Sequence, residues 1–538
     1  MRTLRLILPL VALFPAVSVA MADGLLPPGQ PVEQVVDHYL AVRLKEEGIT
    51  PAGPAGDANL IRRLALDLAG RIPTVDETTA FVASTSPNKR VELVERLMSS
   101  PAFARHQATE FDTMLMNGTR GSVRPYLLTA LTEKRSWDRI YRDLMLPDES
   151  DPKLKSSTEF LRQRVRDLDK LTAEVSSIFF GVNVSCARCH DHPLVRDWKQ
   201  DHFFGMKSFF SRTYEAGGKL AERETGLVKF KTTKGVERQA RLMFLTGKVI
   251  ETDTLKDAPG GTPKGRKGRK DGDKNAPPPP APKFSARTEL VKLSLEPGQR
   301  DFFARSIVNR VWHRLFGYGL VMPLDQMHSE NPPSHPELLD WLARDTVEHN
   351  YDLRRLIRGL VLSRAYARDS RWQNGDAPRP QMFAVARVKP LTPMQLAVSL
   401  RVAVADPQSL PANLKPEEFD KRLQGLESSA GGYARLFEQP GDDFQVGVSE
   451  ALLFNNNDRI QKDLLADGGD RLLGRMKQLK DVDAMIDLAV RTVLSRPPRD
   501  EERKLLGDYL KQRADRMAEA QRQLVWVLLT SAEFRFNY

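Results

Sequence analysis

The stretch CARCHDHP, residues 186–193, contains the only two cysteines of a 538-residue chain and places two histidines directly after them. Cys186 and Cys189 have the Cys-x-x-Cys spacing, and His190 follows at once. This pattern attaches c-type haem, because the two thiols reach the two vinyl groups on one edge of a porphyrin and the adjoining imidazole ligates the iron. The motif therefore predicts one covalent haem c, with both cysteines as thioethers and His190 as the proximal iron ligand.

Two other chemistries are open to the same residues. Thiolate and imidazole also bind zinc, so Cys186, Cys189, His190 and His192 could form a metal clip, although four ligands within so short a stretch strain a tetrahedral site. The cysteines could instead stay free or close a short disulfide, which would be redox-labile rather than structural. The cofactor is thus haem c, zinc or none.

A haem would also need a distal ligand or an open sixth position, and the sequence leaves both possible. His192 is too close to His190 to reach the opposite face of a macrocycle. Phe203 and Phe210 share a helical face with Met206, and such a face covers either a macrocycle or an ordinary core. The distal candidates are Met206, His202, His328 and His335.

The second half of the chain carries further polar residues that could do chemistry. Asp325 and His328 have types suited to an acid–base or metal pair. In SENPPSHPELLDWL, Ser334 is expected to cap a helix with Pro336 in its first turn, which favours a structural role for His335 over a role as ligand. No Gly-x-Ser-x-Gly motif accompanies these residues, so a hydrolase using Asp325, His328 or His335 is only a third hypothesis.

The elements that position the motif are mainly helical. Apolar residues recur at helical spacing in NLIRRLALDLAGRIP, and Thr74 with Glu77 predicts a capping box for the next helix. A second apolar stripe runs from Leu168 to Phe179 and stops at Gly181, a typical helix end. The cysteine motif therefore follows directly on the end of a helix.

Two segments in the middle of the chain break the helical pattern. Residues 213–255 read as a small β segment, with short alternating runs in LVKFKTT and MFLTGKVIET and a turn near Lys234-Gly235. Residues 256–286 are dense in Pro, Gly and Lys, which predicts a disordered basic linker. Helical patterning resumes over 287–538. The fold class is therefore mainly α, with two helical domains, 23–212 and 287–538, around the β segment and linker.

The first 22 residues predict a signal peptide. Arg2 and Arg5 precede the apolar run Leu6–Val19, and small residues stand just before Asp23, where cleavage is expected. A spanning helix needs about 20 apolar residues, and this run is shorter and contains prolines. We therefore expect an exported, periplasmic or otherwise extracytoplasmic protein without a transmembrane span. Export does not imply a disulfide-stabilised fold, because two cysteines can form only one disulfide in a chain of 538 residues.

Composition gives broader limits. With 41% hydrophobic and 28% charged residues the chain is an ordinary globular protein. Its net charge of +11 suits an acidic partner or an anionic surface. Part of that charge lies in PKGRKGRKDGDK, residues 263–274, which is better read as a solvated loop. Basic and aromatic residues do not interleave as in nucleic-acid binders, so no nucleic-acid partner is expected.

Several stretches resemble a known family. The chain is similar to large exported proteins of planctomycetes and related bacteria that pair two domains of unknown function, the first of them called planctomycete cytochrome-c-like. The most specific match is NRVWHRLFGYGLV followed by NPPSHPELLDWLA. The resemblance implies a cytochrome-c-like first domain that carries CxxCH. The matching stretches are residues 59–77, 176–210, 309–343, 452–458 and 531–537.

The leading functional hypothesis is electron transfer or redox sensing by an exported c-type haem protein with an unknown redox partner. The alternative is a non-haem scaffold or binding protein. In that case the motif would be a disulfide or metal clip, and the second half would bind an extracellular partner or the machinery that processes extracellular polysaccharide.

Overall fold

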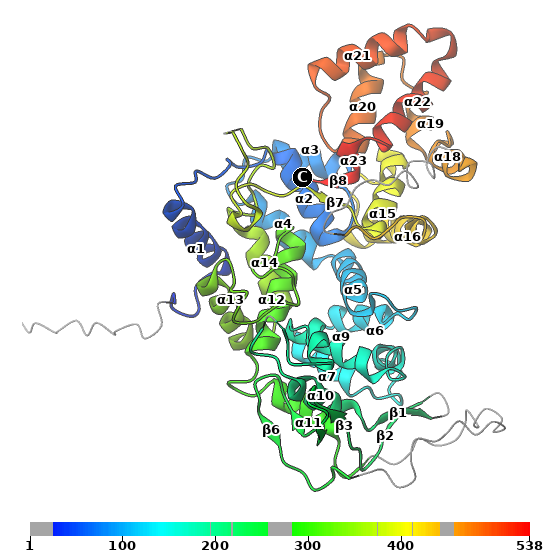
Figure 1. The fold of residues 1–538 in the computed structure, drawn as a ribbon. Helices are drawn as coiled ribbons and strands as arrows, with labels where there is room; N and C mark the ends of the chain where they lie inside the picture. Colours follow the sequence, from blue (N-terminus) through cyan, green and yellow to red (C-terminus); the bar gives the residue numbers. More distant parts are fainter. Residues whose placement is uncertain are drawn as a thin grey trace, which may run out of the picture.

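The computed structural model describes residues 25–538 with gaps at 194, 217–218, 257–281, 374, 412 and 442–456. The predicted signal peptide, residues 1–22, and most of the predicted linker lie outside the described residues. In the described part, helices dominate and strands form only short antiparallel pairs, so the prediction of a mainly α fold is confirmed (Figure 1).

Ten α-helices are described before the β segment. They are α1 (Val32–Glu46), α2 (Asp57–Ala69), α3 (Val75–Ala83), α4 (Lys89–Ser99), α5 (Pro101–Met116), α6 (Arg124–Thr132), α7 (Trp137–Met145), α8 (Glu159–Arg162), α9 (Leu168–Phe180) and α10 (Gln200–Phe210). Short 3-10 turns occur at η1 (Lys155–Thr158) and η2 (Ser185–Arg188). The predicted capping box is confirmed, because Thr74 accepts the amide of Glu77 and Glu77 accepts that of Thr74.

Three small hairpins make up the predicted β segment. They are β1 (Thr213–Ala216) with β2 (Lys219–Glu222), β3 (Lys229–Lys231) with β4 (Glu237–Gln239), and β5 (Leu242–Met243) with β6 (Val249–Ile250). Phe230 pairs with Arg238 in the second hairpin. The predicted turn at Lys234-Gly235 lies between these two strands, so this prediction is also confirmed.

Helices resume after the linker. They are α11 (Ala286–Ser294), α12 (Asp301–Phe316), α13 (Pro336–Glu348), α14 (Leu353–Leu362), α15 (Pro393–Val404), α16 (Pro416–Ala434), α18 (Asp458–Leu464), α19 (Leu472–Met476), α20 (Val482–Leu494), α21 (Asp500–Lys511), α22 (Met517–Leu529) and α23 (Ala532–Arg535). The 3-10 turns η3 (Pro380–Met382), η4 (Pro407–Ser409) and η5 (Ala514–Arg516) separate some of them, and β7 (Lys389–Pro390) pairs with β8 (Phe536–Asn537). No helix within the described ranges has the length and apolar character needed to span a bilayer.

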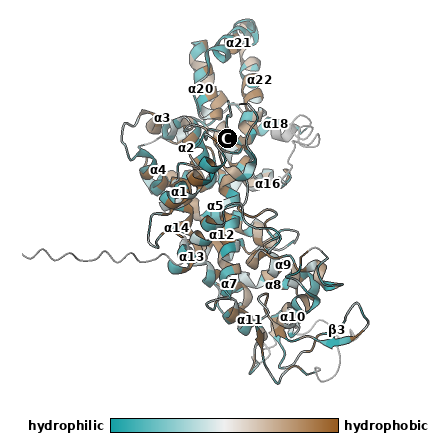
Figure 2. Cartoon of the chain, turned by 60° about the vertical axis from the view of Figure 1, so that its left-hand side comes forward, coloured by the Kyte–Doolittle hydropathy of each residue, from teal (hydrophilic) through white to brown (hydrophobic). Residues whose placement is uncertain are grey.

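Two hydrophobic clusters hold the helices together. The larger one draws buried side chains from α1 to α10 and also from α11 to α14, so segments on both sides of the linker share a core. The smaller one is built mainly from residues 391–534, with Leu66 and Ile72 added from the N-terminal part. Brown and teal residues alternate along the helices in Figure 2, as expected where one helix face is buried and the other is wet.

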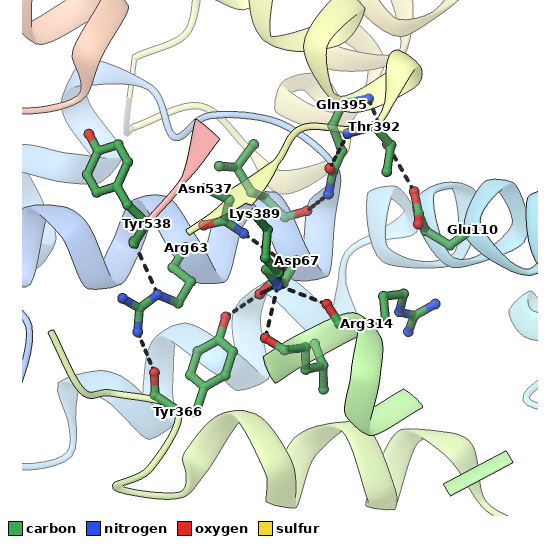
Figure 3. Close-up of polar contacts among 12 residues, drawn as sticks. Arg63, Asp67, Glu110, Arg314, Tyr366, Lys389, Thr392, Gln395, Asn537 and Tyr538 are labelled. Atoms are coloured by element: carbon green, nitrogen blue, oxygen red, sulfur yellow. Dashed lines mark hydrogen bonds and ion pairs between the residues drawn. The ribbon is translucent and has the colours of Figure 1, made fainter. Parts of the chain in front are cut away.

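A buried polar cluster on α2 joins the two bodies that form around the larger and the smaller hydrophobic cluster (Figure 3). The carboxylate of Asp67 accepts hydrogen bonds from Tyr366 Oη at 2.7 Å, Asn537 Nδ2 at 2.9 Å and Lys389 Nζ at 3.0 Å. Lys389 Nζ also donates to the carbonyls of Arg314 and Leu315, each at 2.9 Å. Strand β7, strand β8 and the end of α12 are thus tied to a single carboxylate on α2.

Candidate functional site

The cysteine motif forms the turn η2 between α9 and α10. Helix α9 ends at Gly181, which has a left-handed φ of 67° and whose amide donates to Ser177 O at 3.1 Å, as the sequence predicted. Val184 and Ala187 are fully buried and fix the turn to the larger core. The residues between and after them face solvent.

Both thiols are available for chemistry. Cys186 and Cys189 are free and exposed. The guanidinium of Arg188 lies beside the sulfur of Cys189, and this contact raises the pKa of Arg188 above its usual value. Two accessible thiols in a single turn can be alkylated, can form thioethers or can bind a metal.

The ring of His190 is oriented by the backbone. Its Nδ1 lies 2.7 Å from the carbonyl oxygen of Asp191, which can only accept, so Nδ1 carries the proton and the lone pair is on Nε2. Asp191 is itself held, since its carboxylate accepts the amide of Gln200 at 2.9 Å. An imidazole whose Nδ1–H donates to a carbonyl is the usual form of a metal-ligating histidine.

His192 and His202 have the opposite arrangement. The Nδ1 of His192 accepts the amide of Val195 at 3.0 Å, and the Nδ1 of His202 accepts the amide of Lys199 at 3.1 Å. In each neutral ring the proton is therefore on Nε2. Burial lowers the pKa of both rings, and His328 and His190 add to this effect at His192.

Met206 is the other distal candidate on α10, and its side chain belongs to the larger hydrophobic cluster. It is fully buried, as are Phe203 and Phe210 on the same helix face. The apolar face that the sequence left open between macrocycle and core therefore packs against protein.

A segment far along the chain is bonded to both flanks of the motif. We call residues 325–329 the strap. On one flank, the amide of Asn183 donates to Asp325 O at 2.7 Å, and that of Met327 donates to Gly181 O at 3.0 Å. On the other, Asp197 accepts the amide and the hydroxyl of Ser329 at 2.8 and 2.9 Å.

The strap brings Asp325 and His328 to the motif. The carboxylate of Asp325 accepts the side-chain amide of Asn183 at 3.1 Å, which makes it a positioning group for the loop. His328 lies close enough to His192 to influence its protonation. The sequence made His328 one of four distal candidates and Asp325 part of an acid–base or metal pair, but no pattern in the sequence indicated that Asp325 contacts the loop that carries the cysteines.

Arg310 on α12 stabilises the end of α9, just before the cysteine motif. The sequence alone did not predict this role. Nε and Nη2 of Arg310 donate to the carbonyls of Ile178 and Ser177, at 3.1 and 2.6 Å, in the last turn of α9. Burial lowers the pKa of Arg310 to about 10, and Asp325 opposes that effect. A basic residue that binds the last carbonyls of a helix is a known cap, but only the fold shows which helix it serves.

His335 is elsewhere in the second half. It is buried against Phe383, and its Nδ1 lies 3.1 Å from Ser334 Oγ. Within the part of the chain that the structure describes, no hydrogen bond connects it to Asp325 or His328. Nor do the described residues contain a group of three or more His, Cys, Asp or Glu side chains arranged to hold a metal ion.

The expected Ser334 cap is wrong. Helix α13 begins with Pro336 in its first turn, as predicted, but its N-cap residue is His335, which makes no side-chain cap. The hydroxyl of Ser334 is engaged with the His335 ring instead, and its amide donates to Leu320 O at 2.8 Å.

Comparison with known proteins finds a family match in each of two regions of the chain. Residues 35–215 match a family described as "Protein of unknown function (DUF1549)", and residues 286–425 match one described as "Protein of unknown function (DUF1553)". No curated protein matches the chain, and no solved structure does. The expected pairing of two domains of unknown function is confirmed, with the cysteine motif in the first matched region and the strap in the second.

Proposed function

We propose that residues 186–190 attach one c-type haem and that the chain is an exported redox protein that passes electrons to a partner. The observation that carries the proposal is the donor set: two free, exposed thiols in one turn, beside a histidine whose Nδ1 is held by a backbone carbonyl. Haem would supply one-electron chemistry when bound.

The chain's own residues have distinct roles in this proposal. Cys186 and Cys189 would hold the haem through two thioether bonds, since both thiols are free and exposed. His190 would bind the iron through its Nε2 lone pair, and the Asp191 carbonyl orients the ring and makes it more basic. Arg310, Asn183 and the strap hold the turn in place.

The net charge of +11 over the whole chain favours an acidic partner. Arg188, Arg196 and Lys199 are exposed in and just after the motif. Carboxylates lie in the same region: Asp169 pairs with Arg188 at 3.7 Å, and Asp191 and Asp197 accept hydrogen bonds from backbone amides. Exposed cations beside a redox centre steer a negatively charged partner to it.

The test is to export the chain from a host with cytochrome c maturation. We expect a haem-staining band on a denaturing gel and an intact mass raised by one haem, both lost in Cys186→Ala/Cys189→Ala. The neighbouring exposed residue gives the matched control, Ser185→Ala, which should retain the haem.

A chain without haem, from a host that matures a control cytochrome, would reject the proposal. Elemental analysis for zinc and alkylation of the two thiols before and after reduction would then separate a metal clip from a disulfide or free thiols. Hydrolysis that survives both cysteine changes but is lost in His328→Ala would point to the hydrolase hypothesis.

A further inference from the structure

The second matched region places an imidazole at the cysteine motif. His328 lies in the middle of the strap, between Met327, which is bonded to Gly181 before the motif, and Ser329, which is bonded to Asp197 after it. Moving His328 away from the motif would break one of these anchors. The residue is therefore held beside the loop of residues 184–196 by contacts on either side.

The position of His328 is also fixed by the loop that follows. Asn331 Nδ2 donates to the carbonyls of Gln326 and Met322, at 2.9 and 3.2 Å, and its amide donates to His328 O at 3.0 Å. The conformation of the strap is thus fixed by contacts within the second matched region, and the strap then contacts the first matched region. Pre-organised ligands of this kind lose little entropy when they bind.

The ring of His328 is uncommitted. Neither of its nitrogens has a hydrogen-bond partner among the described residues, and Nδ1 is shielded from solvent. A shielded ring nitrogen without a partner is costly and can be satisfied by water or by a bound group. Nε2 of His335 is shielded in the same way, but that ring packs against Phe383. The other histidines at the motif each have one nitrogen engaged: His190, His192 and His202.

The two candidates on α10 are less suitable. Met206 is packed in the larger core, and its sulfur would have to leave that core to reach a ligand. His202 uses its Nδ1 lone pair on the Lys199 amide. Neither residue belongs to an element that bridges the two flanks of the motif.

We propose that His328 supplies the distal imidazole ligand to the haem iron held by Cys186, Cys189 and His190. This inference rests on the proposed function. It makes the site a joint product of the two domains of unknown function, because the first supplies the attachment residues and the second supplies the opposing ligand. The strap would then position a haem ligand in addition to packing against the motif.

The experiment uses the full haem-loaded chain and reads the spin state of the ferric iron by absorption and electron paramagnetic resonance. We expect a low-spin, bis-imidazole signal in the parent protein and a high-spin signal in His328→Ala, with free imidazole restoring the low-spin form. His328→Met should give the different low-spin signature of a thioether ligand, and it fills the same space if the alanine variant folds poorly.

The matched control is His349→Ala, which removes a histidine that already bonds to Asp345 O at 2.9 Å. Its signal should equal that of the parent. A parent that is high-spin, or a His328→Ala variant that stays low-spin, would overturn the inference while leaving the proposed function intact. Absence of haem from the intact mass would instead reject the proposed function, and the inference with it.

Discussion

At the scale of the residue, Gly181 shows how closely the motif is built against its neighbours. Its φ is 67°, and a Cβ at this position would lie 2.8 Å from the sulfur of Met327 in the strap. A side chain would therefore meet both an unfavourable backbone conformation and a clash with the segment that covers the motif.

We expect Gly181→Ala to lower the free energy of unfolding by more than the roughly 1–2 kcal/mol that a left-handed residue costs. Gly48→Ala is the matched control, because Gly48 has a φ of 66° but no atom within 4 Å of the added Cβ. Denaturant unfolding of both variants measures the difference. Equal losses would mean that the strap does not press on Gly181.

The sequence could predict the binding chemistry of the cysteine motif because its residues are close together along the chain. Cys186, Cys189 and His190 are neighbours in sequence, so their spacing alone predicts what they can bind. Asn183 and Asp325 are 142 positions apart, and no periodicity or cap signal reports such a contact. The strap, and with it the placement of His328, therefore had to come from the fold.

At the scale of the element, α2 carries two aspartates that are each paired with a lysine but in different surroundings. The side chain of Asp67 is 6% exposed and bonds to Lys389, which is 16% exposed. The side chain of Asp57 is 38% exposed and bonds to Lys89 at 2.6 Å. Helix α2 therefore carries one buried and one solvent-exposed Asp–Lys ion pair.

We expect Asp67→Asn to destabilise the protein by about 3–5 kcal/mol, because it leaves the ammonium of Lys389 buried without its counter-charge. Asp57→Asn should cost less than about 1 kcal/mol, as exposed ion pairs do. Both values come from denaturant unfolding. Similar losses in the two variants would show that the polar cluster of α2 does not hold the two bodies together.

Local signals predicted element ends well where one residue type dominates the geometry. The capping box at Thr74 and the helix end at Gly181 are confirmed. A Ser/Thr–Glu pair at this spacing and a left-handed glycine each fit few local backbone conformations other than a helix end. The expected cap at Ser334 is wrong, because the helix begins one residue later, at N-cap His335, and the Ser334 hydroxyl lies 3.1 Å from Nδ1 of the His335 ring.

At the scale of the whole molecule, buried histidines make stability depend on pH. Burial, aided by Arg43, lowers the pKa of His335 to about 4, and burial lowers that of His106 to about 3. An unfolded histidine has a pKa near 6.5, so the unfolded chain binds more protons below that value. The stabilisation is therefore complete above about pH 6.5 and is lost as the pH falls toward 4. Glu110, whose pKa is raised by burial, has the opposite dependence.

We expect His335→Asn to flatten this curve. Between pH 7 and pH 5 the parent should lose about 2 kcal/mol more than the variant, since one proton is worth roughly 1.4 kcal/mol per pH unit. Unfolding free energies measured across this range provide the test, and replacement of the exposed His38 by Asn is the control. Parallel curves for the parent and His335→Asn would refute the assignment.

The cluster on α2 has a consequence for biogenesis. Arg62 bonds to the carbonyl of Phe534, and Asp67 bonds to Asn537, across 472 and 470 positions. Contacts this distant in sequence form late, since the loop that they close is almost the whole chain. If the chain crosses a membrane amino end first, α2 emerges long before its partners. The half-made protein would then expose the cationic side chains of Arg62 and Arg63, which makes it a client for a chaperone with an acidic surface until their partners emerge.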